Sequence, residues 1–117
     1  MSGWDEVRRI YLPPPWDNCW VECHSNVPIG QWLDLKDAVA LAQGDPRVEN
    51  IEPLVTMLGG FVVAHNIPDV EGNPLTFTLR SMSSKLITAV SQAVAIAQEG
   101  GGAAVDPLAK TEPLPAP

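Results

Sequence analysis

Basic residues are scarce in this chain of 117 residues, which has seven Lys and Arg against fourteen Asp and Glu and a formal charge of −7. An acidic excess of this kind repels phosphate backbones unless the few cations gather into a patch. Arg8 and Arg9 are the only adjacent basic pair. The composition therefore predicts that the protein does not bind nucleic acid.

Side chains suited to soft-metal binding or thiol chemistry are also few: Cys19, Cys23, His24 and His65. A structural zinc site needs four converging ligands, but Cys23 and His24 are neighbours on a predicted strand and point to opposite faces. On that strand the two cysteines lie ~13 Å apart, too far for a disulfide. No positive charge stands between them to activate a thiol. We expect two reduced, buried thiols, no metal and no cofactor.

The chain also lacks a long apolar run and the residue pattern of a hydrolase. No apolar stretch reaches the roughly 18 residues of a membrane span, and the start lacks the basic and apolar regions of a signal peptide. Ser81, Ser83 and Ser84 have no glycine elbow around them and are suited to capping a helix. We expect a non-enzymatic cytosolic protein that does not enter a membrane.

Apolar residues make up 45% of the sequence, enough for one modest core. We predict a single small domain over residues 1–99. The glycines at 100–102 stop the last helix, and the Pro- and Ala-rich remainder of residues 100–117 is expected to form a flexible, disordered tail.

Two segments near the N-terminus are typical of strands. Residues 6–12 are rich in β-branched and aromatic types, and residues 18–24 alternate at period two. The Pro-rich stretch between them suits a hairpin loop. In the second strand we expect the core to receive Cys19, Val21 and Cys23, and the opposite face to carry Trp20, Glu22 and His24.

Three later segments predict helices that pack on this hairpin: residues 29–43, 51–64 and 81–98. Asn50 is a candidate N-cap for the second helix. Gly59 and Gly60 weaken its later half, where the β-branched residues Val62 and Val63 leave a short strand open as the alternative. The expected fold class is α+β, with a two-stranded β-hairpin packed on about three α-helices and a disordered C-terminal tail.

Residues 60–75 pass from an apolar run into an acidic stretch interrupted by Gly72 and Pro74. Residues 69–73 lack the alternating oxygen ligands and the closing Glu of a calcium loop. Asp and Asn accept local backbone hydrogen bonds, and Gly supplies a positive φ. The pattern predicts a turn that ends one apolar segment and leads into the last helix.

The order of these parts resembles the small tail assembly chaperones of long-tailed bacteriophages, over about residues 6–98. The resemblance rests on the hairpin, the first helix and a motif made up of His65, Asn66, Asp69, Gly72 and Pro74. At the position of His65, members of this family commonly have Trp.

The resemblance implies a non-catalytic chaperone of the host cytoplasm that binds the tape-measure protein and the major tail protein, and that is absent from the mature virion. Self-association is left open. The alternative is a structural virion component, such as a head–tail connector or a minor tail protein.

A chaperone of this kind needs exposed apolar surface for its client and net charge for its own solubility. Trp20 is one candidate for a partner surface, because it lies on the strand face opposite the cysteines. The other candidate is a stripe of the last helix formed by Leu86, Ile87, Val90 and Val94. Each has a structural alternative: Trp20 would cover the first helix, and the stripe would pack into the protein's own core.

Overall fold

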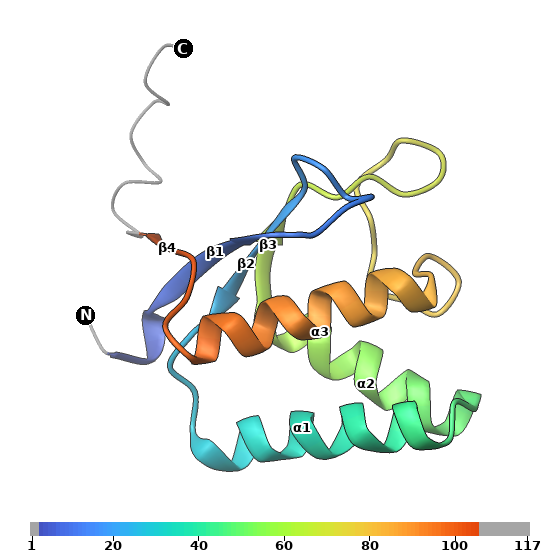
Figure 1. Cartoon of the computed structure of the whole chain (residues 1–117), viewed down its shortest axis with the longest axis horizontal. Helices are drawn as coiled ribbons and strands as arrows, with labels where there is room; N and C mark the ends of the chain where they lie inside the picture. The colour runs from blue at the N-terminus through green and yellow to red at the C-terminus, as the bar shows by residue number, and fades with distance from the viewer. Residues whose placement is uncertain (1–2, 106–117) are drawn as a thin grey trace.

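The computed structural model describes residues 3–105, and its elements form one sheet with helices packed against it (Figure 1). Within this range the elements are η1 (Gly3–Asp5), β1 (Val7–Tyr11), β2 (Trp20–His24), α1 (Ile29–Gly44), α2 (Val48–Phe61), β3 (Val62–His65), α3 (Ser84–Gln98) and β4 (Ala103–Val105). The predicted α+β class, with a hairpin packed on three helices, is confirmed.

The predicted hairpin is the centre of a four-stranded antiparallel sheet with the order β3-β2-β1-β4. In the hairpin, Arg9 pairs with Glu22 and Ile10 pairs with Val21. On its other side β2 pairs with β3, and the register shifts at a bulge between Glu22 and Cys23. β2 is therefore hydrogen-bonded on both of its edges.

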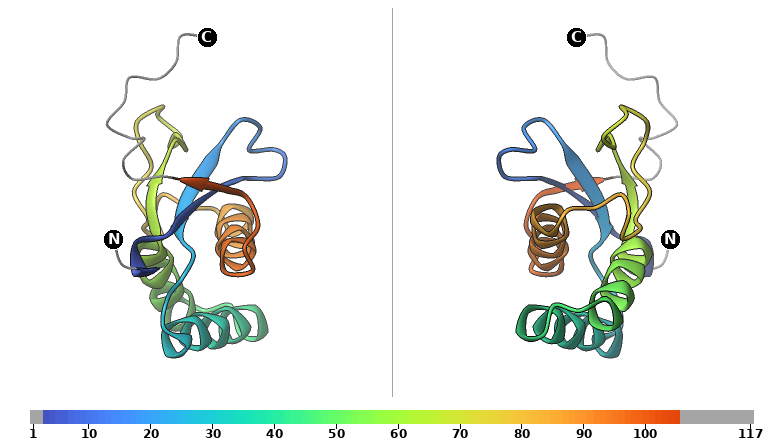
Figure 2. Two further views of the ribbon diagram at one scale, coloured as in Figure 1. Left: turned by 90° about the vertical axis from the view of Figure 1, so that its left-hand side faces the viewer. Right: turned by 90° about the vertical axis from the view of Figure 1, so that its right-hand side faces the viewer.

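The core lies between the inner face of this sheet and helices α2 and α3. Val21 and Cys23 are fully buried, as predicted, and Cys19 is half-buried. Helix α3 lies across β1 and β2 (Figure 2). Ser83 caps α3, since its hydroxyl accepts a hydrogen bond from the Leu86 amide at 3.1 Å.

Helix α1 lies farthest from the sheet and packs chiefly against α2 (Figures 1 and 2). Its buried side chains are Leu35 and Ala38. The predicted N-cap of α2 is wrong, because the helix begins one turn earlier with Arg47 as its N-cap residue. The side-chain nitrogen of Asn50 instead donates to the carbonyl of Asp45 at 2.8 Å.

The preferred prediction of helix through residue 64 is also wrong, and the strand alternative holds. Helix α2 ends at Phe61, and Val62–His65 continues as β3. Two β-branched residues begin this strand, which favours an extended backbone. Pairing with β2 supplies the backbone hydrogen bonds that a longer α2 would otherwise have made.

The tail was predicted to start at residue 100, which is too early, because Ala103–Val105 forms β4 against β1. Gly100 and Gly102 have φ values of 86° and 77°, which turn the chain back toward the sheet. The side chain of Arg8 then donates to the carbonyls of Gly101 at 2.6 Å and Gly102 at 2.8 Å. The rest of the predicted tail, residues 106–117, lies outside the described range.

We expect Gly102→Ala to lower the free energy of unfolding by about 1–3 kcal/mol, since an L residue is strained at positive φ. A Cβ there would also collide with Ile10 and with the carbonyl oxygen of Arg9. Gly60→Ala is the matched control: position 60 is helical with open space around it, so this change should stabilise by up to about 1 kcal/mol. Urea unfolding of both variants tests this, and equal midpoints would contradict it.

Candidate functional site

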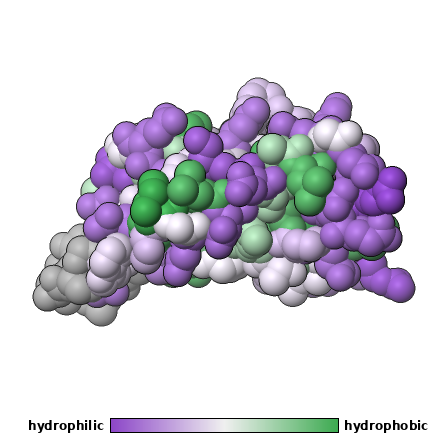
Figure 3. Space-filling view, turned by 90° about the horizontal axis from the view of Figure 1, so that it is seen from below, coloured by the Kyte–Doolittle hydropathy of each residue, from purple (hydrophilic) through white to green (hydrophobic). Residues whose placement is uncertain are grey.

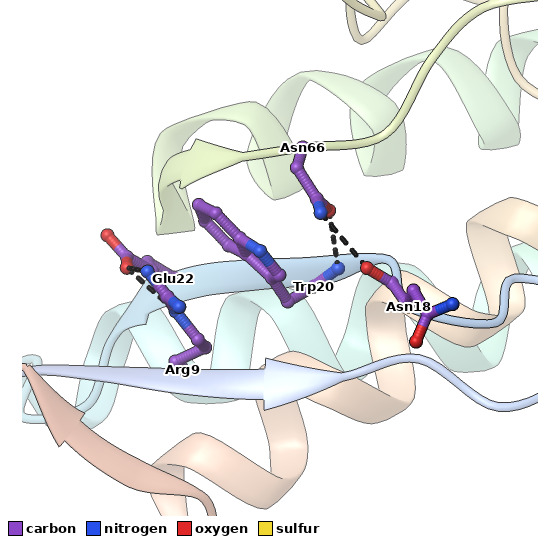
Figure 4. A network of polar contacts seen from close by, with 5 residues as sticks. All are labelled: Arg9, Asn18, Trp20, Glu22 and Asn66. Carbon is purple, nitrogen blue, oxygen red and sulfur yellow. Dashed lines mark hydrogen bonds and ion pairs between the residues drawn. The ribbon is translucent and has the colours of Figure 1, made fainter. Parts of the chain in front are cut away.

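Asn66 joins the end of β3 to the hairpin (Figure 4). Its side-chain oxygen accepts from the Trp20 amide at 2.7 Å, and its side-chain nitrogen donates to the Asn18 carbonyl at 3.0 Å. Its backbone amide donates to the Trp20 carbonyl at 3.3 Å. Asn18 has a φ of 66°, a conformation that Asn tolerates better than most residues. Asn66 thus continues the β2–β3 pairing beyond the last residue of the strand.

Asp69 organises the predicted turn. Its carboxylate accepts from the backbone amides of Glu71 at 2.8 Å and Asn73 at 2.9 Å. Gly72 has a φ of 86° and donates to the Asp69 carbonyl, while Pro74 forms an isolated bridge with Pro68. The turn prediction is confirmed. Its tip carries Val70, which is 99% exposed.

The His65 ring makes two contacts with the segment that follows β3. Its Nδ1 accepts a hydrogen bond from the Ile67 amide at 3.1 Å. The centre of its ring lies 5.4 Å from that of Phe77. His65 therefore helps to hold the segment between β3 and α3 against the domain.

Trp20 lies on the outer face of the sheet beside an ion pair (Figure 4). The guanidinium of Arg9 lies 3.9 Å from the centre of the Trp20 ring and donates to Glu22, which is only 2% exposed, at 2.6 and 3.0 Å. Partial burial lowers the pKa of Arg9, but hydrogen bonds to Glu22 and Tyr11 raise it overall. The alternative that Trp20 covers the first helix does not hold, because Trp20 stacks on Arg9 and is absent from the core cluster.

Both residues of the adjacent basic pair make contacts within the domain. Arg9 forms an ion pair with Glu22, and Arg8 donates to backbone carbonyls just before β4.

The four residues of α3 predicted as a partner surface do not lie on one surface of the structure. Leu86, Val90 and Val94 are buried, with at most 2% of each exposed. The proposal of a partner contact is wrong for these three, because they face the core that α3 shares with β1 and β2. Ile87 is half-buried and lines a groove on another side of the helix.

That groove lies between α1 and α3, with α2 as its floor, and has a volume of about 600 Å³. We call it the helical groove and define it by its main lining residues, Trp32, Val39, Ile51, Leu54, Ile87 and Ala95. Most of its exposed lining is apolar. Polar groups come mainly from the α3 wall, where the Ser91 hydroxyl already donates to the Ile87 carbonyl at 2.8 Å.

Three further large apolar side chains of α1 are exposed outside this groove. Ile29 is 69% exposed, Leu33 48% and Leu41 54%. Viewed from the α1 side, apolar side chains come to the surface in separate groups among polar ones (Figure 3). The sequence patterns did not identify these exposed residues. The available signal was that Leu33 and Leu41 lie off the apolar face formed by Trp32, Leu35 and Val39.

The surroundings of Cys23 disfavour ionisation of its thiol. Burial, followed by the nearby Glu22 charge, raises the pKa of the Cys23 thiol to about 12, so the thiol stays protonated at neutral pH. Among residues 3–105, no group of three or more His, Cys, Asp or Glu side chains could hold a metal ion. No helix in the described part of the chain has the length and apolar character to cross a membrane.

Comparisons of this chain with protein-family models, with curated proteins and with solved structures find no match.

We expect Asn66→Ala to lower the free energy of unfolding by about 1 kcal/mol, because two hydrogen bonds between β3 and the hairpin are lost. Asn66→Asp keeps the acceptor for Trp20 but loses the donor, so its loss should be smaller. Asn73→Ala, at an exposed position in the turn, is the control and should change stability by less than about 0.5 kcal/mol. Chemical unfolding ranks the stability losses of the three variants. Equal losses for Asn66→Ala and Asn73→Ala would contradict the prediction.

Single-thiol variants test the state of Cys23. Cys19→Ser leaves Cys23 alone, and its reaction with a disulfide reagent should stay slow from pH 7 to pH 9.5, because burial keeps the thiol protonated up to a pKa of about 12. Urea should release a fast reaction. Cys23→Ser leaves the half-buried Cys19, which should react at once. Fast labelling of Cys23 in the folded protein would contradict its burial.

Proposed function

We propose that this chain is a non-enzymatic phage tail assembly chaperone and that the helical groove, with the exposed apolar side of α1, holds its client. The client would be an apolar segment of the tape-measure protein, held until the tail-tube subunits receive it. The observation that carries the proposal is the open groove of about 600 Å³, lined mainly by apolar side chains.

Two properties of this surface favour protein binding. The first is its form, an open groove between helices that is lined mainly by apolar side chains, with Ile29 and Leu33 also exposed on α1. The second is the formal charge of −7, which opposes self-association through an exposed apolar surface. Large exposed apolar areas on small proteins commonly mark interaction sites.

The choice of client comes from the resemblance to phage tail assembly chaperones. The motif of Asn66, Asp69 and Gly72 holds the sheet and the turn after β3 together, so its residues are structural supports of the domain. The client surface is therefore assigned to the helices and not to the motif.

The proposal predicts that co-expression with the tape-measure protein of the same genome keeps that client soluble. Thr88→Trp places a large ring in the groove from an exposed α3 position and should abolish this protection. Thr56→Trp is the matched control, since Thr56 is exposed on α2 and does not line the groove. This variant should protect the client as the unmodified chain does.

Equal precipitation of the client with and without the chain would reject the chaperone role. Mass spectrometry of purified virions adds a second reading, because a chaperone should be absent from them. Recovery of the chain at a fixed copy number per virion would instead favour a structural tail or connector protein.

A further inference from the structure

We infer that the outer face of the sheet binds a segment of the chain itself, residues 112–117, with its prolines on Tyr11 and Trp20. We call residues 106–117, which follow β4, the C-terminal segment. The surface formed by Arg9, Tyr11 and Trp20 is called the aromatic face. None of these three side chains lines the helical groove, so the inference goes beyond the proposed function and does not depend on it.

The strand register brings the side chains of the aromatic face together. Arg9 pairs with Glu22, and Tyr11 pairs with Trp20. Paired and alternate residues of antiparallel strands share a face, so these four side chains lie opposite the buried Ile10. Tyr11 is 61% exposed, Trp20 is half-buried, and both are absent from the core cluster. Two aromatic side chains are thus neighbours on the side of the sheet away from the core.

Arg9 holds the Trp20 ring in a defined position before any ligand binds (Figure 4). Its guanidinium lies 3.9 Å from the centre of that ring and donates to Glu22 at 2.6 and 3.0 Å. Arg9 also has a hydrogen bond with Tyr11. Side chains that are already ordered lose little conformational entropy on binding, so the aromatic face is preorganised.

Ordered aromatic side chains are suited to proline-rich segments. Such segments favour the extended polyproline II conformation, and they dock on aromatic-lined surfaces at a small cost in entropy. The C-terminal segment has Pro113, Pro115 and Pro117, one at every second position. Each proline also disfavours the helical conformation for the residue before it. The sequence that follows β4 therefore belongs to the class of ligand that this face fits.

The position of β4 brings this sequence within reach of the aromatic face. Val105 pairs with Val7, and the far end of β1 lies four residues farther on, about 13 Å away along the strand. Strand β2 lies about 10 Å from β4 across β1. Residues 106–113 span up to about 25 Å in the polyproline II conformation. Asp-Pro at positions 106–107 favours the turn that a return along the sheet requires.

The charges on the two sides are complementary. Glu112 directly precedes the prolines. The Arg9 side chain is 36% exposed, and its guanidinium has more N–H donors than the two that Glu22 accepts. A carboxylate beside Pro113 can therefore bind Arg9 while the prolines contact the neighbouring rings.

The covalent link favours binding within one chain over binding between copies. A short flexible linker holds an attached segment at an effective concentration of about 1 mM. A segment that binds with a Kd of about 100 µM as a separate peptide would then be bound about nine-tenths of the time. Weak contacts of a few prolines are therefore sufficient for the segment to cover the aromatic face.

Trypsin cleavage after Lys110 tests the inference on the full chain. Lys110 is the only basic residue of the C-terminal segment, and binding of the residues after it should protect this site. When binding and release are faster than cleavage, the cleavage rate follows the released fraction. Tyr11→Ser should therefore raise the rate by about five- to tenfold, as mass spectrometry of the released peptide measures. Leu33→Ser, at an exposed position of α1, is the matched control and should leave the rate unchanged.

A second variant keeps the test valid if Tyr11→Ser loosens the sheet, which urea unfolding would reveal. Pro113→Gly with Pro115→Gly leaves the described domain intact and should raise the rate similarly. Synthetic peptides of residues 106–117, with and without these changes, correct for the preference of the protease. NMR of the unmodified chain should show contacts between the proline rings and the Trp20 ring.

Equal cleavage of the unmodified chain and both variants would overturn the inference, as would the absence of the NMR contacts. Protection that decreases as the protein is diluted would overturn it in favour of binding between two copies. An equal rise for Leu33→Ser and Tyr11→Ser would also overturn it, because the effect would then not come from the aromatic face.

Discussion

The pairing of β2 with a strand on each side determines much of this structure. After His24 the chain leaves the sheet, and it must return beside the same strand at Val62. Helix α2 makes the return, so its apolar side, with Leu54, Leu58 and Phe61, enters the core. Helix α1 makes the outward path and has α2 as its main support. Because the strand pairing places α1 on α2 and away from the sheet, several apolar side chains of α1 stay exposed to solvent.

Local patterns predicted the elements that a single segment can specify. Period-two alternation identified β2, and a regular apolar stripe with a serine cap identified α3. Patterns that depend on distant partners were misjudged. Ala103 and Ala104 have a low strand propensity, and they form β4 because β1 offers a free edge and Arg8 binds the carbonyls before them. Helix α2 ends before Val62 because β2 lies close enough to pair with the following residues.

The candidate site was harder to predict, because periodicity shows that a face is apolar and does not show what covers it. The stripe of α3 and the face of α1 are similar in sequence, yet Val90 is fully buried while Ile29 is 69% exposed. The groove also depends on the separation of α1 from α3, which no segment encodes alone. The turn after β3 could be predicted because its contacts are local: Asp69 and Gly72 close it within a few residues. The contact of Asn66 with the hairpin is not local and could not be predicted in this way.

The edges of the sheet bear on how this protein avoids aggregation. β3 has four residues and its pairing contains a bulge, while β4 has three residues. Strands this short, one of them irregular, are poor templates for the addition of another chain. A protein that keeps an apolar groove open must not also polymerise through its sheet. If the groove holds a client as proposed, the short edges would confine contact with other molecules to the helices and leave the strands paired within one chain.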